Sequence, residues 1–246
     1  MAALSFDFTG YRVLVVGGTR GAGHAIARSF RDSGAQVTVT GTMMLRELYD
    51  VDLAGIDYEM VNLARQDSMD HLVGIIGPLD ILVLAAGCSL PYGLPDSERS
   101  FIGEAARSGV LGPMFLTTRL RLKLSQSPAP GGGCVINTGA VARWLELTSD
   151  PAGAAAELAA STARAGQNWA GIGVRVNSVL EPARGLLPRQ GGPGAHPSAG
   201  SGSHALSTGD TLVRAGTTAR GPVSSTVMFL ATLEASRITG QTIRLS

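Results

Sequence analysis

Three glycines stand where an apolar run gives way to a segment with helical periodicity. They are Gly17, Gly21 and Gly23 in the stretch VVGGTRGAGHAIA. Glycines at such a junction permit a tight turn and let backbone N–H groups approach a pyrophosphate at the start of the helix. The strand before the loop and the helix after it make the pattern more specific than glycines alone. It predicts a phosphate-binding loop made of Gly17, Thr19, Arg20, Gly21, Ala22 and Gly23.

Short apolar runs alternate with helical segments along the whole chain, as they do in βαβ units. Seven strands are expected, in YRVLVVGG, AQVTVTG, YEMVNL, LDILVLAAG, CVINTGA, GVRVNSVLEP and QTIRLS. Helices are expected from the glycine loop to about Ser33, over roughly 97–124, and over 151–170. We therefore predict an α/β fold, in which one Rossmann-type doubly wound domain spans residues 1–246 around a seven-stranded parallel sheet.

Residues 183–208 interrupt this alternation. The stretch ARGLLPRQGGPGAHPSAGSGSHALST is rich in Gly, Pro and Ser, and it is longer than a simple connection between elements. It follows the carboxyl end of a strand, where open α/β sheets bind ligands. We therefore predict a flexible lid over a site, and the alternative interpretation is a disordered segment without a role.

Motifs at five ordered places resemble the short-chain dehydrogenase/reductase family. One is the Gly-x-x-x-Gly-x-Gly spacing of the glycine loop; DILVLAAG is similar to the family's fourth strand, D-x-L-V-N-N-A-G. LGPMFLTTRL resembles its central helix, GVRVNSV its sixth strand, and RITGQTIRLS its C-terminal end. The resemblance covers essentially the whole chain. It implies a nicotinamide cofactor and the reduction of ketones or oxidation of alcohols.

The residues that follow the second and third strands bear on the choice of cofactor. Enzymes that select NAD usually place an acid at the end of the second strand to bind the ribose hydroxyls, and Gly41 stands there. The resemblance implies that Arg20 lies where NADP-preferring members carry a basic residue, although a solvated loop arginine is the alternative. NADP(H) is therefore the expected cofactor. The resemblance implies that Arg20, Thr42, Asn62, Ala86 and Gly87 contact the cofactor in addition to the glycine loop.

Members of the family reduce ketones with a tyrosine, a lysine, a serine and an asparagine. The tyrosine donates the proton, and the lysine lowers the pKa of its hydroxyl from about 10. When counted back without gaps from Asn177, the tyrosine falls at Pro151 and the lysine at Ala155. A shift by two residues gives Gly153 and Glu157 instead, so neither register recovers the pair.

The two other catalytic positions are also changed. The serine falls at Ala140 and the asparagine at Gly109. Lys123, the only lysine of the chain, falls late in the central helix, away from the edge of the sheet that carries the site. The resemblance thus implies a divergent member that lacks the Asn-Ser-Tyr-Lys catalytic residues.

Glu181 is the candidate catalytic residue, since it follows the sixth strand, close to where the family holds the nicotinamide. A partly desolvated carboxyl group there could have a raised pKa and move a proton; the alternative is a structural ion pair with Arg184. His196 and His204 in the lid are further candidates as proton carriers. No metal site is expected, because Cys88 and Cys134 lack ligand spacing and the histidines lack further ligands.

Composition narrows the class of protein. The 246 residues are 44% hydrophobic and 16% charged, with a net charge of +1, which gives no electrostatic argument for nucleic acid or an anionic membrane. The apolar runs are too short to span a bilayer, and no signal peptide opens the chain. We expect a cytoplasmic protein whose partner is a small-molecule substrate.

Three functions remain open. The preferred one is an NADP(H)-binding reductase of a ketone, such as a polyketide or polyphenolic ketone, in which the substrate's own hydroxyl replaces the Tyr/Lys acid. The second is a non-redox catalyst in secondary metabolism, such as a cyclase, dehydratase or isomerase. The third is a catalytically silent subunit that pairs with an active relative. The family assembles through its two long helices, here near 97–124 and 151–170, so the resemblance implies a homo-oligomer, a dimer or a tetramer.

Overall fold

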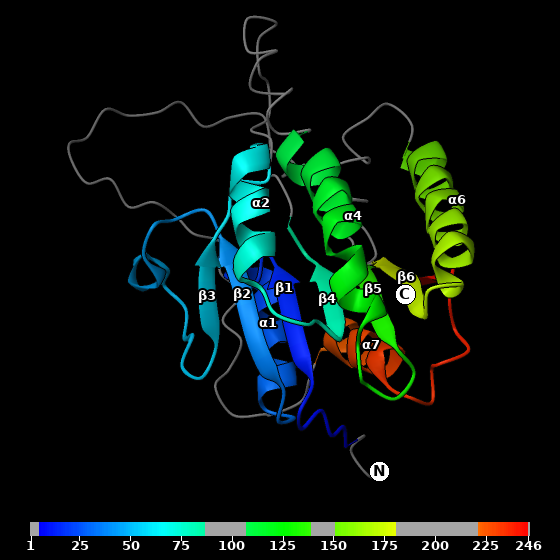
Figure 1. The fold of residues 1–246 in the computed structure, drawn as a ribbon, viewed down its shortest axis with the longest axis horizontal. Helices are drawn as coiled ribbons and strands as arrows, with labels where there is room; N and C mark the ends of the chain where they lie inside the picture. Colours follow the sequence, from blue (N-terminus) through cyan, green and yellow to red (C-terminus); the bar gives the residue numbers. More distant parts are fainter. Residues whose placement is uncertain (1–4, 87–106, 139–150, 181–220, 246) are drawn as a thin grey trace, which may run out of the picture. The chain divides into compact units, whose positions relative to one another are not determined.

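Parallel strands form the centre of the structure, a computed structural model that describes residues 5–86, 107–138, 151–180 and 221–245 (Figure 1). The described strands are β1 (Arg12–Val16), β2 (Gln36–Gly41), β3 (Asp57–Met60), β4 (Ile81–Leu84), β5 (Gly133–Thr138), β6 (Val174–Leu180) and β7 (Thr242–Arg244). They make one seven-stranded sheet in which each pair of neighbours is parallel. The predicted α/β fold and its seven strands are confirmed.

The central strands are buried on both faces because helices cover both sides of the sheet. Four successive residues of β1, all of β4 and all of β6 are buried, as expected for strands of a parallel sheet. The described helices are α1 (Gly21–Arg31), α2 (Gln66–Ile75), α4 (Gly112–Ser125), α6 (Pro151–Ala170) and α7 (Pro222–Ala231), with a 3₁₀ turn at Arg46–Leu48 and a π-helical turn at Arg107–Leu111.

Two apolar cores lie on opposite faces of the sheet. On one face α1 and α7 pack side by side, with Ile26 and Phe30 of α1 and Val227 and Leu230 of α7 in the same buried cluster. On the other face α2, α4 and α6 cover the sheet, as Figure 1 shows, and Leu72 and Leu116 belong to the second cluster. This is the layering of a doubly wound fold.

The strand order is β3-β2-β1-β4-β5-β6-β7. The chain therefore moves outward from β1 to β3, returns, and continues from β4 in the opposite direction. In open α/β sheets, ligands bind outside the carboxyl ends of the strands where the order reverses. Here that point lies between β1 and β4, so a ligand site is expected at the segments that follow these two strands.

The helix α6 is attached to β6 through polar groups inside the fold. The hydroxyl of Thr162 lies 2.7 Å from the hydroxyl of Ser178 and donates to the carbonyl of Leu158. One turn later Gly166 packs so closely on the backbone of Gly240 that a Cβ atom there would lie 2.5 Å from its nitrogen. These contacts attach the second half of α6 to β6 and to the segment before β7.

The expected helices and the observed ones differ. Helix α7 was not among the expected helices, and the described part of the central helix begins with a π-helical turn before α4. The predicted lid at 183–208 lies outside the described residues, and the single domain over 1–246 stays a prediction. In the part of the chain that the structure describes, no helix is long and apolar enough to cross a membrane.

Candidate functional site

Two of the three glycines of the predicted phosphate loop are required by packing. Gly17 follows β1 with a φ of 80°, and a Cβ atom there would lie 2.5 Å from the Cα of Ala86, which follows β4. A Cβ atom at Gly23 would collide with the carbonyl oxygen of Gly17. The Gly17 N–H donates to the side chain of Thr40 at 3.2 Å. The glycines thus let β1, α1 and β4 meet at the reversal of the strand order.

The third glycine, Gly21, faces open space. Its φ is 50°, and no atom lies within 4 Å of the position that a Cβ would take. Arg20, the N-cap residue of α1, makes no capping hydrogen bond with its side chain, and the first turn holds no acid. The first N–H groups of a helix have no partner within the helix, and its N-terminus attracts negative charge. The open side of Gly21 and the uncapped N-terminus of α1 therefore suit a pyrophosphate.

The end of β2 holds a feature that the sequence analysis missed. The hydroxyl of Tyr49 accepts hydrogen bonds from the backbone N–H groups of Thr42, at 2.7 Å, and Met43, at 2.9 Å. This hydroxyl lies so close to Gly41 that a Cβ atom there would collide with it. Gly41 is therefore a glycine because a tyrosine hydroxyl from the following segment takes the space of its side chain.

Tyr49 also lies between the glycine loop and the edge of the sheet. The residue is buried, with 8% of its surface exposed, and the guanidinium of Arg20 lies 5.9 Å from the ring centroid. On its other side, Tyr58 of β3 has its ring centroid 5.7 Å away and donates a hydrogen bond to the carbonyl of Met43. Arg20, Thr42 and the end of β2 are thus brought together around one aromatic side chain.

The two tyrosines have pKa values shifted in opposite directions. Burial alone would raise the pKa of Tyr49, but hydrogen bonds from the Met43 N–H and neighbouring side chains together lower it below the usual value of 10. Burial is the main cause that raises the pKa of Tyr58 well above that value, with its interaction with Tyr49 second. The Tyr49 hydroxyl therefore lies in surroundings that favour a negative oxygen.

Asn62 lies at the same edge, just after β3. Its backbone N–H donates to the hydroxyl of Ser68, and its side-chain oxygen accepts from the N–H of Ala64, both at 2.9 Å. The side chain is exposed. The structure thus brings Arg20, Thr42, Asn62 and Ala86 to the carboxyl ends of neighbouring strands, while Gly87 lies outside the described residues.

The positions that the resemblance assigns to catalysis lie at the start of α6 and before α4. Pro151 begins α6, and Ala155 lies one turn later. Glu157 is exposed and pairs with Arg164 on the same helix at 2.7 Å. Gly109 lies in the π-helical turn, a feature that frequently accompanies functional sites.

The remaining candidate site residues either lie outside the described part of the chain or lie far from the glycine loop. Glu181, Ala140, His196 and His204 lie outside the described residues. Lys123 is in the last turn of α4, next to Leu124, whose carbonyl packs against the first residue of β5. Since a strand begins at the edge opposite to its carboxyl end, Lys123 is far from the glycine loop, as expected.

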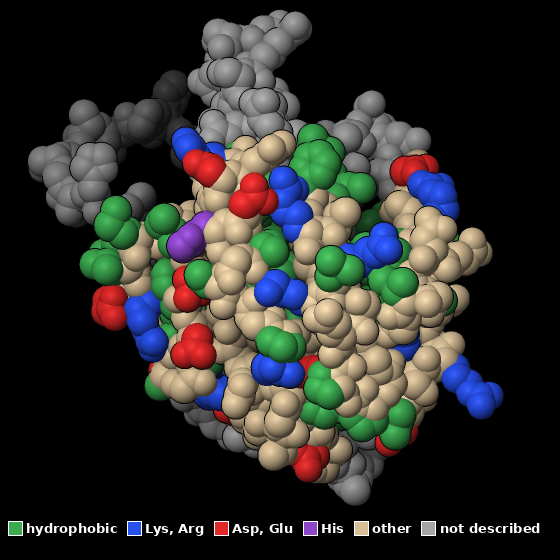
Figure 2. Space-filling view, in the orientation of Figure 1, with side chains coloured by type: hydrophobic (Ala, Val, Ile, Leu, Met, Phe, Trp, Pro, Cys, Tyr) green, Lys and Arg blue, Asp and Glu red, His purple; other side chains and the backbone are tan. Residues whose placement is uncertain are grey.

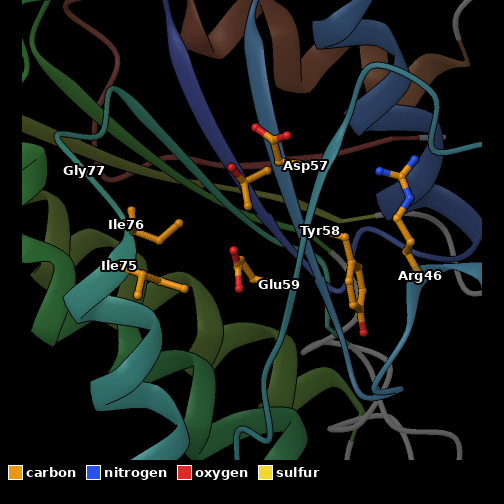
Figure 3. A pocket seen from close by; sticks show the side chains of 8 residues that line it. Arg46, Asp57, Tyr58, Glu59, Ile75, Ile76 and Gly77 are labelled. Carbon is orange, nitrogen blue, oxygen red and sulfur yellow. The ribbon is translucent and has the colours of Figure 1, made fainter.

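A groove of about 490 Å³ is lined by residues of β2, β3 and the end of α2 (Figure 3). Asp57 and Glu59 line it together with Ile75 and Ile76 at the end of α2. The guanidinium of Arg46 is engaged with the carbonyls of Leu53 and Ile56. Two carboxylates repel a phosphate, so this groove is not the place for a dinucleotide.

Among the described residues, no three His, Cys, Asp or Glu side chains cluster in a way that could hold a metal ion. Cys134 lies fully buried in β5, where burial raises the pKa of its thiol to about 11. A thiol in such surroundings stays protonated and inert. It belongs to the core and not to the site.

One family profile matches nearly the whole chain, and two known proteins match parts of it. The sequence profile of a family described as enoyl-(acyl carrier protein) reductase matches residues 16–245. The chain is 28% identical to 2-dehydro-3-deoxy-D-gluconate 5-dehydrogenase from Formosa agariphila over 71% of its length and 69% of that protein. A match of 36% identity to the 3-oxoacyl-(acyl-carrier-protein) reductase of Rickettsia typhi covers 33% of the chain and 34% of that protein.

The fold also matches solved structures. A short-chain dehydrogenase/reductase family protein is 27% identical, with a TM-score of 0.69 over 98% of this chain and 97% of the other. Oxidoreductases of this kind use a nicotinamide cofactor, NAD or NADP, and act on small molecules. The glycine loop, the strand reversal and the match over residues 16–245 lead to one conclusion: the chain belongs to the short-chain dehydrogenase/reductase family.

Proposed function

We propose that the protein reduces a ketone with NADPH and that the substrate, not a tyrosine of the protein, supplies the proton. The observation that carries the proposal is the start of α1, where an uncapped helix N-terminus and the open side of Gly21 leave room for a pyrophosphate. NADPH supplies the hydride when it is bound. Arg20 places a cation beside this loop, which supports a cofactor with an additional phosphate.

The protein's contribution to the reaction is then to hold two reactants together. Positioning can account for roughly 7–11 kcal/mol of a barrier, whereas a general acid contributes typically about 10²–10⁴-fold. Pro151, Ala155, Ala140 and Gly109 carry no proton that they could donate. The alkoxide that a hydride transfer would leave on the substrate would take a proton from a neighbouring phenolic hydroxyl of the same substrate. Water, or the carboxyl of Glu181, then returns that proton.

The cofactor is tested by titrating the protein with NADPH and NADH while following nicotinamide fluorescence. NADPH is expected to bind, and Arg20→Gln is expected to weaken its binding tenfold or more. This size follows because a hydrogen bond to a charged group contributes roughly 1.5–3 kcal/mol. Arg28→Gln, in the last turn of the same helix, is the matched control and should leave NADPH binding unchanged. If neither nucleotide binds, the reductase proposal is wrong.

The source of the proton is tested with pairs of substrates. A ketone that carries a hydroxyl group beside the carbonyl is compared with its methyl ether, which has the same carbon skeleton and no proton to give. We expect turnover of the first and a loss of about 10²-fold or more for the second. Equal turnover of both would mean that a group of the protein supplies the proton.

A non-redox catalyst is the second candidate function. It is supported by the residues at the start of α6, where Pro151 and Ala155 stand. In this case the phosphate loop would be an inherited structural feature. The discriminating result is a protein that binds neither nucleotide but converts a substrate by cyclisation, dehydration or isomerisation, without consumption of a reductant.

A further inference from the structure

Two backbone donors at the end of β2 converge on one oxygen atom. The N–H groups of Thr42 and Met43 both donate to the Tyr49 hydroxyl, at 2.7 and 2.9 Å. Successive backbone N–H groups aimed at one point form the type of concave surface that binds anions. The atom that they hold here is a neutral hydroxyl oxygen from the chain itself.

A third donor is also engaged by the same side chain. The guanidinium of Arg20 lies over the ring of Tyr49, 5.9 Å from its centroid. Thr19 is buried, and its methyl carbon lies 3.0 Å from the position that a Cβ of Gly41 would take. Tyr49 therefore occupies the two N–H groups, and lies next to the Arg20 cation, that a phosphate at the end of β2 would bind.

We propose that Tyr49 is a specificity-determining latch, whose hydroxyl holds the place of a phosphate oxygen and is displaced by the 2′-phosphate of NADP(H). The inference rests on the proposed function, because it requires that the dinucleotide binds along the glycine loop with its adenosine at the end of β2. NAD(H) carries a hydroxyl group instead of this phosphate, and its binding does not depend on the displacement. Tyr49 thus lowers the affinity for NADP(H) without affecting that for NAD(H).

Displacement is favoured by charge. Hydrogen bonds from N–H groups to an anionic oxygen are roughly twice as strong as those to a neutral one, so the phosphate is the stronger ligand of the Thr42 and Met43 N–H groups. The phosphate also gains the Arg20 cation, which in the latched state faces an aromatic ring. Displacement exposes the side chain of Tyr49, which is buried in the latched state, so the charge-assisted bonds to the phosphate must outweigh the loss of that burial.

The test compares Tyr49→Phe with the wild-type protein in titrations with NADPH and NADH. Loss of the hydroxyl removes two competing hydrogen bonds, and we expect NADPH to bind about tenfold more tightly, with NADH within about twofold. Tyr11→Phe is the matched control, because Tyr11 precedes β1 at the opposite edge of the sheet, where its ring packs against Phe8. It should leave the ratio of the two affinities unchanged.

A second measurement follows the latch in the wild-type protein. The backbone amide signals of Thr42 and Met43, observed by nuclear magnetic resonance, should shift when adenosine 2′,5′-bisphosphate is added, and much less with adenosine 5′-monophosphate. Unchanged or weaker NADPH binding by Tyr49→Phe, in a protein that unfolds at the wild-type temperature, overturns the latch. Failure of NADPH to bind either protein would instead overturn the proposed cofactor.

Discussion

At the scale of single residues, Tyr49 and Tyr58 lie in contact, yet they hold their protons with different strength. Hydrogen bonds donated to the Tyr49 oxygen lower its pKa against the effect of burial, whereas burial raises the pKa of Tyr58. On raising the pH, Tyr49 therefore ionises first. The other titratable groups that face it are Arg20 and Tyr58, and Arg46 and Glu47 precede it in its own segment.

This order of ionisation predicts how cofactor binding depends on pH. Below its lowered pKa Tyr49 is a neutral, displaceable hydroxyl; above it, a phenolate holds the two N–H groups more strongly and repels a phosphate. We expect the affinity of the wild-type protein for NADPH to fall with rising pH already below the ordinary tyrosine pKa of about 10. The dissociation constant is measured across this range by fluorescence titration. The same decline in Tyr49→Phe would contradict the assignment.

The glycines of the loop predict a contrast in stability. Gly23→Ala places a methyl group against the Gly17 carbonyl and should lower the free energy of unfolding by about 1–3 kcal/mol. Gly74→Ala, in α2 with open space around it, should raise it by about 0.5–1 kcal/mol. Urea denaturation followed by circular dichroism measures both changes. Equal effects would mean that the loop does not have the close packing described.

Site residues could be predicted from the sequence where the local backbone itself requires the residue type. Gly17 and Gly23 must be glycines for packing, and the pattern shows them. Gly41 was interpreted as an absent acid, but Tyr49, eight residues further on, takes the space of its side chain. No motif contains Tyr49, and only the fold brings it there. A small residue at the end of the second strand, followed by an aromatic residue in the next loop, is the one signal that could have indicated the contact.

At the scale of elements, periodicity and composition decide what can be predicted. The alanine-rich stretch over 151–170 predicts α6 with its observed ends, Pro151 and Ala170. Helix α7, PVSSTVMFLA, begins with β-branched residues and ends in an apolar run, a composition that also suits a strand. Its helical state comes from packing against α1 on one face of the sheet, which a local pattern does not contain.

The attachment of α6 to β6 predicts a difference between two threonines. Thr162 is buried, and its hydroxyl bonds to both Ser178 and the Leu158 carbonyl. Thr118 of α4 makes only the equivalent bond to a carbonyl four residues earlier and is exposed. We expect Thr162→Val to cost about 1–3 kcal/mol of stability and Thr118→Val to change it by less than about 0.5 kcal/mol. Thermal and urea unfolding test the pair, and similar costs would contradict a role of the buried contact.

At the scale of the whole molecule, α4 presents apolar side chains to solvent. Leu111, before the helix, and Met114, Phe115 and Leu122 within it are 43%, 57%, 48% and 69% exposed. Their spacing places them along one side of the helix. Figure 2 shows the face that α4 and α6 share, with apolar, polar and basic side chains mixed over it. Helix α6 has nine alanines among its 20 residues, and such small side chains allow another helix to approach closely.

Relatives in the family are usually oligomeric, and this face is the one that we propose for a second copy of the chain. Large side chains on α4 and small ones on α6 give complementary surfaces if two copies meet around a two-fold axis. Replacing Met114 and Phe115 together by glutamate would bury charge without a partner, which costs several kcal/mol. We expect the wild-type protein to sediment as a dimer or tetramer and the double variant as a smaller species. Ile75→Glu, at an exposed site on α2, is the control that should keep the wild-type state. If the wild-type protein sediments as a monomer, the proposed interface is wrong, and so is the proposal that the chain pairs with an active relative.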